Sequence, residues 1–314
     1  MKLALLFALC CTAPLFAQRE RFPTEKSAEL KDEGRTWFVD GHSKLPSTIS
    51  VTNHRATVIE GIGTENVIEL SGTLSLKASL GGTVVLKNVW IEIEPDAQEL
   101  YLSQVQFQGG GIRTTPNGAT APKIFAEFTK FDASASVSLR MCAGEVDMQQ
   151  CEFGSVVTLV GIPQSEKAAN KSDIGLLDCR GLPGGLVCQG IATVQVRGCN
   201  IGGAITRITN WVALDFDGNN SHSTVFEFEL PSYGKFKTAK IHNCDFRTTQ
   251  IAFKCPADDG KAEKWTLEHC YFAGLVDPKV IASTLIVDHA TDAKIGLDVQ
   301  LKRIAPNALG LGGQ

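Results

Sequence analysis

The sequence predicts an all-β chain: a single-stranded, right-handed parallel β-helix of roughly nine or ten stacked coils, with a short N-terminal capping helix. Three observations support this fold. A six-residue pattern recurs along the chain, a second short apolar run follows it in each repeat, and most cysteines fall at fixed points of the repeat. One such unit cannot bury its own apolar face, so stacking the units creates one continuous core.

The six-residue pattern is an apolar residue, two further residues, a Cys or a substitute, one residue, and an aromatic or aliphatic residue. Its clearest copy is Ile241–Phe246. A second apolar run follows, as in Val156–Leu159 and Val225–Phe228, and such short alternating runs between Gly or Asn breaks are typical of strands. The fourth position of the pattern recurs every 16 to 28 residues and is assigned to Val89, Val105, Phe131, Cys151, Cys179, Cys199, Asn219, Cys244 and Cys270.

The repeat at Ile241–Phe246 resembles the rungs of the pectate-lyase-like right-handed β-helix superfold, and the resemblance covers roughly residues 51–290. It implies the fold but no single activity, because this superfold includes lyases, hydrolases, esterases, epimerases and non-enzymatic adhesins. Such proteins often carry a stacked polar ladder, which here would lie one residue before the fourth position. Its members would be Asn88, Gln104, Lys130, Gln150, Asp178, Gly198, Gly218, Asn243 and His269.

The cysteines leave two interpretations open. A second set, Cys142, Cys188 and Cys255, follows the fourth position of its repeat by 11, 9 and 11 residues. Disulfides are natural in an exported chain. However, neighbouring coils lie ~4.8 Å apart, and this separation exceeds the Cβ distance of ~3.8 Å in a disulfide. We therefore favour buried free thiols.

The first 17 residues are typical of a signal peptide. Lys2 supplies the positive start, Leu3–Phe16 is almost wholly apolar, and Ala17 is a small residue at the end. We therefore expect a secreted, periplasmic or cell-surface protein. The remaining chain is divided into a capping segment at 18–50 with a helix between Pro23 and Gly34, a β-helix at 51–290, and a C-terminal strand with a Gly-rich tail at 291–314.

Composition narrows the range of partners. The 314 residues include 30 Lys and Arg against 34 Asp and Glu, which gives a net charge of −4. Phosphate binding usually requires a basic excess, so we expect no nucleic-acid partner. After the N-terminus, no apolar run approaches the ~20 residues that span a bilayer, so we also expect no membrane span. The oligomeric state is left open.

The outward-facing side chains of the last repeats form a candidate site. Residues two and four before the fourth position should point outward on one strand face. The candidate binding residues are Arg197, Gln195 and Asp215, and the candidate catalytic residues are Asp217, His242, Lys240 and Glu268. An Arg or Lys could act as the base of a polysaccharide lyase, and two carboxylates about 10 Å apart could act as an inverting pair after some bending. The alternative is that opposite charges simply pair across neighbouring strands.

Two further features bear on this site. Asp215, Asp217 and Asn219 offer oxygen ligands at alternating positions, which suggests Ca²⁺, but the later bidentate Glu is missing and a plain turn is favoured. No other metal or cofactor is expected. The longer loops should project from one side of the β-helix and form a wall beside the strip; they are Pro116–Lys123, Pro163–Ser172, Pro231–Lys240 and Pro256–Lys264.

Two functional hypotheses follow. The first is an exported, non-catalytic β-helix that binds carbohydrate or another cell-envelope component, or serves as a structural or interaction module at the cell surface. The alternative is a polysaccharide lyase or glycoside hydrolase acting on an acidic, pectin-like polysaccharide. We favour the first because the motifs of known β-helix hydrolases are missing: Asp258-Asp259 and Gly41-His42 are the nearest pieces, in the wrong order.

Overall fold

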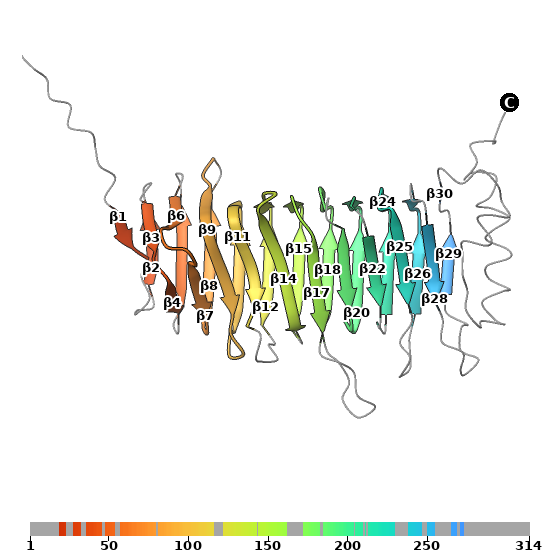
Figure 1. Ribbon diagram of the computed structural model, residues 1–314, viewed down its shortest axis with the longest axis horizontal. Coiled ribbons are helices and arrows are strands. Elements are labelled where there is room, and N and C mark those ends of the chain that lie inside the picture. The colour runs from red at the N-terminus through yellow and green to blue at the C-terminus, as the bar shows by residue number, and fades with distance from the viewer. Residues whose placement is uncertain are drawn as a thin grey trace, which may run out of the picture.

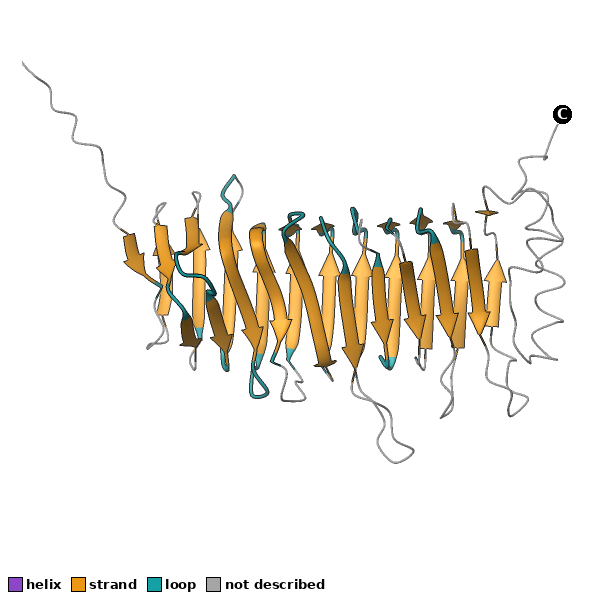
Figure 2. Ribbon diagram, in the orientation of Figure 1, coloured by secondary structure: helices purple, strands orange, loops and turns teal. Residues whose placement is uncertain are grey.

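The computed structural model forms one elongated stack of parallel strands, and the strands run across its long axis (Figure 1). No helix is found in the described part of the chain (Figure 2). The parallel β-helix is thus confirmed, while its right-handed sense stays a prediction. The residues described are 19–22, 28–32, 36–45, 48–53, 57–79, 81–115, 122–142, 144–161, 172–182, 185–203, 205–209, 211, 213–229, 238–246, 250–254, 265–268 and 271–272.

Three sheets make up the described stack, and the smallest of them is formed only by coils in its C-terminal half. Sheet A has fifteen strands, sheet B eleven and sheet C four. The main path of sheet A is β1 (Arg19–Arg21), β3 (Thr36–Val39), β6 (Thr57–Gly61), β9 (Val84–Ile93), β11 (Val105–Thr114), β14 (Ala135–Cys142), β17 (Val157–Gly161), β19 (Leu186–Gln189), β22 (Ile205–Thr209), β25 (Val225–Glu229) and β28 (Gln250–Lys254). Its remaining strands are β4 (His42–Leu45), β7 (Val67–Leu70), β13 (Lys130–Phe131) and β16 (Glu152–Phe153).

Sheet B carries the predicted site. Its strands are β2 (Ala28–Asp32), β5 (Ile49–Asn53), β8 (Thr73–Ala78), β10 (Glu99–Ser103), β12 (Lys123–Glu127), β15 (Glu145–Gln149), β18 (Asp173–Leu177), β20 (Thr193–Arg197), β23 (Ala213–Asp217), β26 (Thr238–His242) and β29 (Trp265–Glu268). Sheet C consists of β21 (Asn200–Ile201), β24 (Asn220–Ser221), β27 (Asp245–Phe246) and β30 (Tyr271–Phe272). Within each sheet the strands pair in register, so equivalent side chains form columns along the axis.

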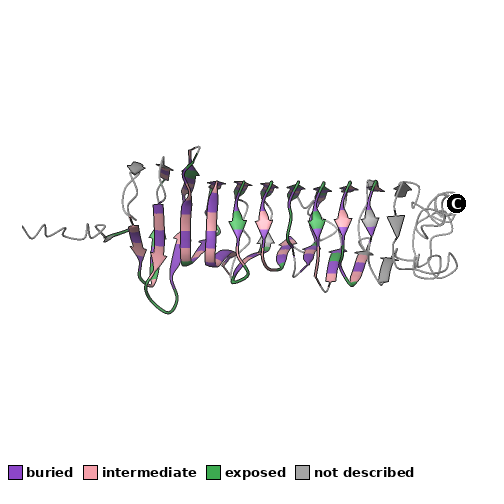
Figure 3. Ribbon diagram, turned by 90° about the horizontal axis from the view of Figure 1, so that it is seen from above, coloured by how far each residue is buried: buried purple, intermediate pink, exposed green. Residues whose placement is uncertain are grey.

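Alternation of residue type explains these strands. In β20, Val194 and Val196 are buried while Gln195 and Arg197 are exposed. Because successive side chains of a strand point to opposite faces, one row enters the core and the other faces outward. The same alternation of buried and more exposed bands is seen along the strands whose burial is coloured in Figure 3.

A sharp corner follows the sheet B strands from β10 to β26 and sets the repeat. At this corner one residue takes a positive φ, such as 55° at Gln104 and 51° at Gln150, and the next residue turns into the core. The other described members of this corner column are Phe128, Asp178, Gly198, Gly218 and Asn243. Six members of the predicted polar ladder therefore lie in this corner column. Two other described members, Asn88 and Lys130, do not.

The predicted polar ladder and the predicted repeat are both wrong at the third copy of the six-residue pattern. Phe107 pairs with Phe131, so Phe131 belongs two residues beyond the fourth position, which Thr129 occupies instead. Phe128 and Phe131 are three residues apart, like the first and fourth positions of the pattern, so the repeat was placed two residues too late. Lys130 therefore lies outside the corner column. The first copy is also displaced, because Asn88 and Val89 lie within β9 of sheet A, where Val89 pairs with Gly110.

The buried column of fourth positions is confirmed from Cys151 to Cys244. The backbone N–H that follows each member donates to the preceding member's carbonyl: Arg180 to Cys151, Asn200 to Cys179 and Asn220 to Cys199, each at 2.9 Å. The thiols are free and buried at the five described cysteines, Cys151, Cys179, Cys188, Cys199 and Cys244. Free thiols, rather than disulfides, are thus confirmed for this part of the chain.

The thiols of this column also satisfy backbone groups. Cys179 donates through Sγ to the carbonyl of Met148 at 3.2 Å, and Cys244 donates to the carbonyl of Phe216 at 3.4 Å. Beside the thiols, the rings of Phe107 and Phe131 stack with centroids 4.8 Å apart. The core is therefore ordered in columns, one side chain for each coil.

The N-terminal end differs from the expected cap. Ala28–Asp32, which fall inside the predicted helix, form β2 and pair with β5, for instance through Leu30 and Val51. The alternation of Ala28 and Leu30 with charged residues suits a strand, and β5 supplies the backbone partners that a helix would have found within itself. The residues on either side of β2, like the C-terminal tail and the long loops predicted to form a wall, lie outside the described residues.

Candidate functional site

The predicted strip lies on the outer face of sheet B, on neighbouring strands. Asp215 pairs in register with Gln195 on one side and Lys240 on the other. In the adjacent column, Asp217 pairs with Arg197 and His242. The sequence therefore placed these residues side by side correctly, because a parallel sheet with an unbroken register aligns equivalent positions of successive repeats.

Five of the outward side chains form one network, which we call the charged cluster: Arg197, Asp215, Asp217, His242 and Asn243. Arg197 forms an ion pair with Asp215. His242 contacts Asp215 through Nε2 at 3.3 Å and Asp217 through Nδ1 at 3.1 Å. Asn243 donates through Nδ2 to Asp217 at 3.0 Å. The sequence predicted Asn243 only as a member of the polar ladder. Its position directly after His242 could have indicated that it also reaches Asp217.

The electrostatics of the charged cluster limit its chemistry. The hydrogen bond and the charge of Asp215 raise the pKa of Arg197 above its ordinary value. A guanidinium held in this way is harder to deprotonate than a free one, and a lyase base must be deprotonated before it can accept a proton. Both ring nitrogens of His242 already contact carboxylates. Asp215 and Asp217 thus hold Arg197 and His242 in place on the face of sheet B.

Other predicted residues stay outside the network. Lys240 and Gln195 are exposed, and neither forms a hydrogen bond or an ion pair with the cluster within the described residues. Glu268 pairs in register with His242, but its side chain is not among those described. Asn219 is buried, and its amide bonds the backbone of Cys199 and Val196 in the core, so it does not join Asp215 and Asp217.

A continuous column of outward side chains connects this cluster with the middle of the molecule. We call it the edge lane, because it is the outward column nearest the corner of sheet B. With the ~4.8 Å spacing of strands, its six members extend over about 24 Å. The edge lane consists of Glu127, Gln149, Leu177, Arg197, Asp217 and His242, each in register with the next.

At the N-terminal end of the edge lane, aromatic rings and a carboxylate meet on the same face. Tyr101 and Phe125 stack with centroids 5.0 Å apart, and the ammonium of Lys77 lies 4.1 Å from the centroid of the Tyr101 ring. Glu127 accepts hydrogen bonds from Tyr101 at 2.9 Å and from Ser103 at 2.8 Å. This arrangement was not predicted, since the fourth position of that repeat had been misplaced.

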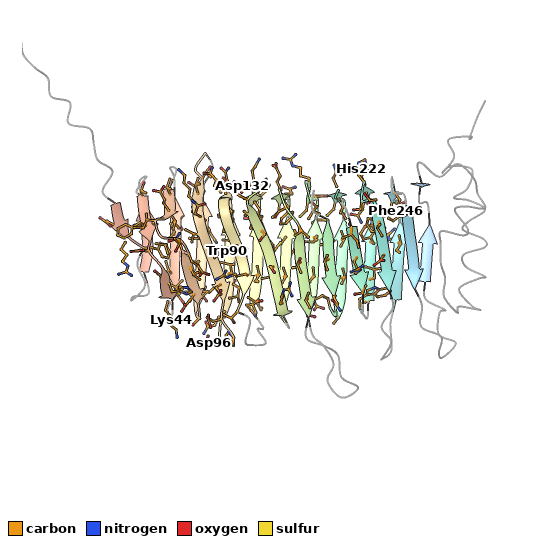
Figure 4. All side chains as sticks on the ribbon, in the orientation of Figure 1. Lys44, Trp90, Asp96, Asp132, His222 and Phe246 are labelled. Carbon is orange, nitrogen blue, oxygen red and sulfur yellow. The ribbon has the colours of Figure 1, made fainter. Side chains whose placement is uncertain are left out.

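A second group of charges, also missed from sequence, lies on the outer face of sheet A. We call it the Arg113 cluster: Glu65, Trp90, Glu92 and Arg113. Arg113 bonds Glu92 through Nε at 2.5 Å and Glu65 through Nη2 at 2.9 Å, and its guanidinium carbon lies 5.0 Å from the Trp90 ring centroid. Trp90 sits midway across the N-terminal half of the stack (Figure 4). Register alone could have joined Glu92 to Arg113, which pair between β9 and β11.

Glu94 stands two residues beyond Glu92, near the Arg113 cluster. Burial raises its pKa above the ordinary value, and the charges of Glu69, Glu92 and Asp96 raise it further, against the opposing effect of Lys44. Lys44 and Asp96 lie together at one edge of the stack (Figure 4). Burial and the neighbouring carboxylates thus favour the protonated form of Glu94.

Two general tests give no further candidate. No group of three or more His, Cys, Asp or Glu side chains in the described ranges is arranged to hold a metal ion. The same part of the chain includes no helix that could span a membrane. Comparisons with protein-family models, with curated proteins and with solved structures gave no match.

Proposed function

We propose that this protein is exported and binds polysaccharide along the edge lane of sheet B without cleaving it. The observation that carries the proposal is the unbroken register of Glu127, Gln149, Leu177, Arg197, Asp217 and His242. A polymer that lies along the axis meets one such side chain every ~4.8 Å. Export is supported by the signal-peptide pattern of residues 1–17.

The charged cluster supports binding rather than catalysis. Arg197, Asp215 and His242 neutralise one another, so their polar atoms are held in place on a rigid sheet. Fixed hydrogen-bonding groups suit the hydroxyls of a sugar, because little side-chain freedom is lost on binding. The raised pKa of Arg197 argues against its role as a lyase base.

The proposal is tested with purified full-length mature protein and a panel of soluble polysaccharides. Affinity electrophoresis should show retardation by at least one polymer, and Asp215→Asn should weaken it several-fold because Arg197 and His242 lose a shared partner. Glu227→Gln is the matched control, since it breaks the equally exposed Arg207 pair on sheet A. Retardation by no polymer, or equal loss in both variants, would overturn the proposal.

Catalysis is examined in the same samples. Polymers incubated with the protein should release no new reducing or unsaturated ends. Release that disappears in His242→Ala would show that the charged cluster is catalytic and would contradict the proposal.

A glycoside hydrolase acting at sheet A is the second candidate function. Its support is Glu94, whose pKa is raised, beside Glu92, which is ion-paired with Arg113. Glycosidases use one protonated and one ionised carboxyl, set apart by their environments. This candidate predicts reducing ends that fall by about 100-fold in Glu94→Gln and stay unchanged in His242→Ala.

A further inference from the structure

Phe128 does not fit the corner at which it lies. Its φ is 49°, in the left-handed region, whereas other coils place Gly198, Gly218 or Asn243 at this corner. Gly and Asn adopt this conformation readily, and a bulky aromatic residue adopts it at a cost. Phe128 is also 56% exposed, so burial does not compensate that cost. A strained residue of this kind is a reason to look for function.

Two amide side chains flank Phe128 in the corner column. The backbone N–H of Gln104 donates to the carbonyl of Glu127 at 3.1 Å, and that of Phe128 donates to Gln149 at 3.1 Å, which stacks Gln104, Phe128 and Gln150 on consecutive coils. Coils lie ~4.8 Å apart, so both glutamines are within reach of a ligand that rests on Phe128. Neither side-chain amide has a hydrogen-bond partner among the described residues.

A carboxylate held in a fixed orientation stands directly before Phe128. Oε1 of Glu127 accepts from Tyr101 at 2.9 Å and from Ser103 at 2.8 Å. Burial and the bond to Glu127 raise the pKa of Tyr101, which keeps its hydroxyl a donor. The second oxygen of Glu127 has no partner within the described part of the chain, and it can accept from a ligand hydroxyl.

We propose that Phe128, Glu127, Gln104 and Gln150 bind one sugar ring of a neutral polysaccharide. The aromatic ring covers the apolar C–H face of the sugar, while the carboxylate and the amides bond its hydroxyls, which is the usual mixture of apolar surface and a few polar groups in a small-ligand site. The inference rests on the proposed function and deepens it, because Glu127 is the first residue of the edge lane.

The surrounding charge selects a neutral sugar over an acidic one. Glu127 is itself a carboxylate, and Asp147 lies on the next strand of sheet B, in register with Phe125, two residues before Glu127. The nearby Lys77 ammonium is placed over the Tyr101 ring. A uronic acid would therefore meet an excess of negative charge, and like charges at this range repel each other.

The experiment replaces Phe128 with a residue suited to its backbone. In Phe128→Asn the strain is relieved, so the melting temperature should rise by about 2–4 °C, while affinity for hydroxyethyl cellulose, amylose or galactomannan, whichever the wild type binds, should fall about tenfold or more. Phe128→Tyr should keep the affinity. Ile62→Asn, which removes another exposed apolar side chain outside the edge lane, is the matched control and should leave the affinity unchanged.

The outcomes separate this inference from the proposed function. Unchanged affinity of Phe128→Asn, with weakened binding in Asp215→Asn, overturns the inference and leaves the proposed function standing. No binding of any polymer by the wild type overturns both. Wild-type binding to polygalacturonate alone overturns the choice of a neutral sugar, and a lower melting temperature in Phe128→Asn overturns the argument from strain.

Discussion

The side-chain carbonyl of Asn219 accepts a hydrogen bond from the backbone N–H of Cys199, one coil earlier, at 2.8 Å. Its Nδ2 donates to the carbonyl of Val196 at 2.8 Å. The same carbonyl, three residues before the fourth position of the preceding coil, accepts a hydrogen bond from a thiol in other coils. The donors there are Cys151, Cys179, Cys199 and Cys244. Asn219 thus replaces a cysteine in the column and adds a second bond.

Replacement of Asn219 should show what this substitution contributes. Asn219→Leu removes the side-chain bonds to two buried backbone groups and should lower the free energy of unfolding by about 2 kcal/mol. Asn219→Cys keeps a donor for Val196 and should cost about half as much. Urea denaturation followed by circular dichroism measures both, with exposed Asn200→Leu as the control. Equal stability of Asn219→Leu and the wild type would contradict a bonding role.

Three of the buried thiols, those of Cys151, Cys188 and Cys199, should resist modification in the folded protein. Burial raises the pKa of Cys188 to about 12. The bond to Cys179, together with burial, raises the pKa of Cys151 and of Cys199. The thiolate is the reactive form, so alkylation near neutral pH should be slow at these sites until denaturant is added. Peptide mass spectrometry measures each site, and a disulfide-linked peptide among the five described cysteines would contradict the interpretation.

Glu94 should make the protein less stable as the pH rises. Its folded pKa is raised above the ordinary 4.5, so the fold is favoured when Glu94 is protonated and loses that contribution as the pH rises through the folded pKa. Glu94→Gln should therefore gain a few tenths of a kcal/mol near neutral pH, and the gain should vanish below the ordinary pKa. Denaturation of both proteins near neutral pH, and again at a pH below the ordinary pKa of Glu94, measures the effect. Exposed Glu99→Gln is the control, and a gain that persists in acid would contradict the assignment.

Asp132 should have the opposite pH dependence. Burial works to raise its pKa, but hydrogen bonds from Ser134, Gly109 and Ala135 outweigh it and lower the pKa below 3.8. Its contribution is therefore complete above the ordinary pKa and is lost as the pH falls below it. Asp132→Asn should cost about 1 kcal/mol near neutral pH and less in acid. Thermal denaturation across this range tests the prediction, with exposed Asp96→Asn as the control; a cost that does not change with pH would contradict it.

The fold was largely predictable because its signal is repeated. Cys151, Cys179, Cys199, Cys244 and their neighbours place the same residue class at the same point of successive coils, and only stacking buries such a column. The register of Arg197 beside Asp217 and of Asp217 beside His242 followed from the same alignment. The alignment was wrong where a strained, exposed Phe128 imitates the first residue of the pattern, because sequence spacing contains no information on φ.

The sequence by itself determined the coiled architecture, the buried thiol column and the order of side chains along the edge lane, since each depends on periodicity that is local to the chain. Only the tertiary structure decided which charges meet. Asp215 could have paired with any neighbouring cation, yet it contacts both Arg197 and His242. Ion pairs of this kind depend on side-chain rotamers and on the exact corner geometry, and both are set by packing between coils that lie some 20 residues apart in sequence.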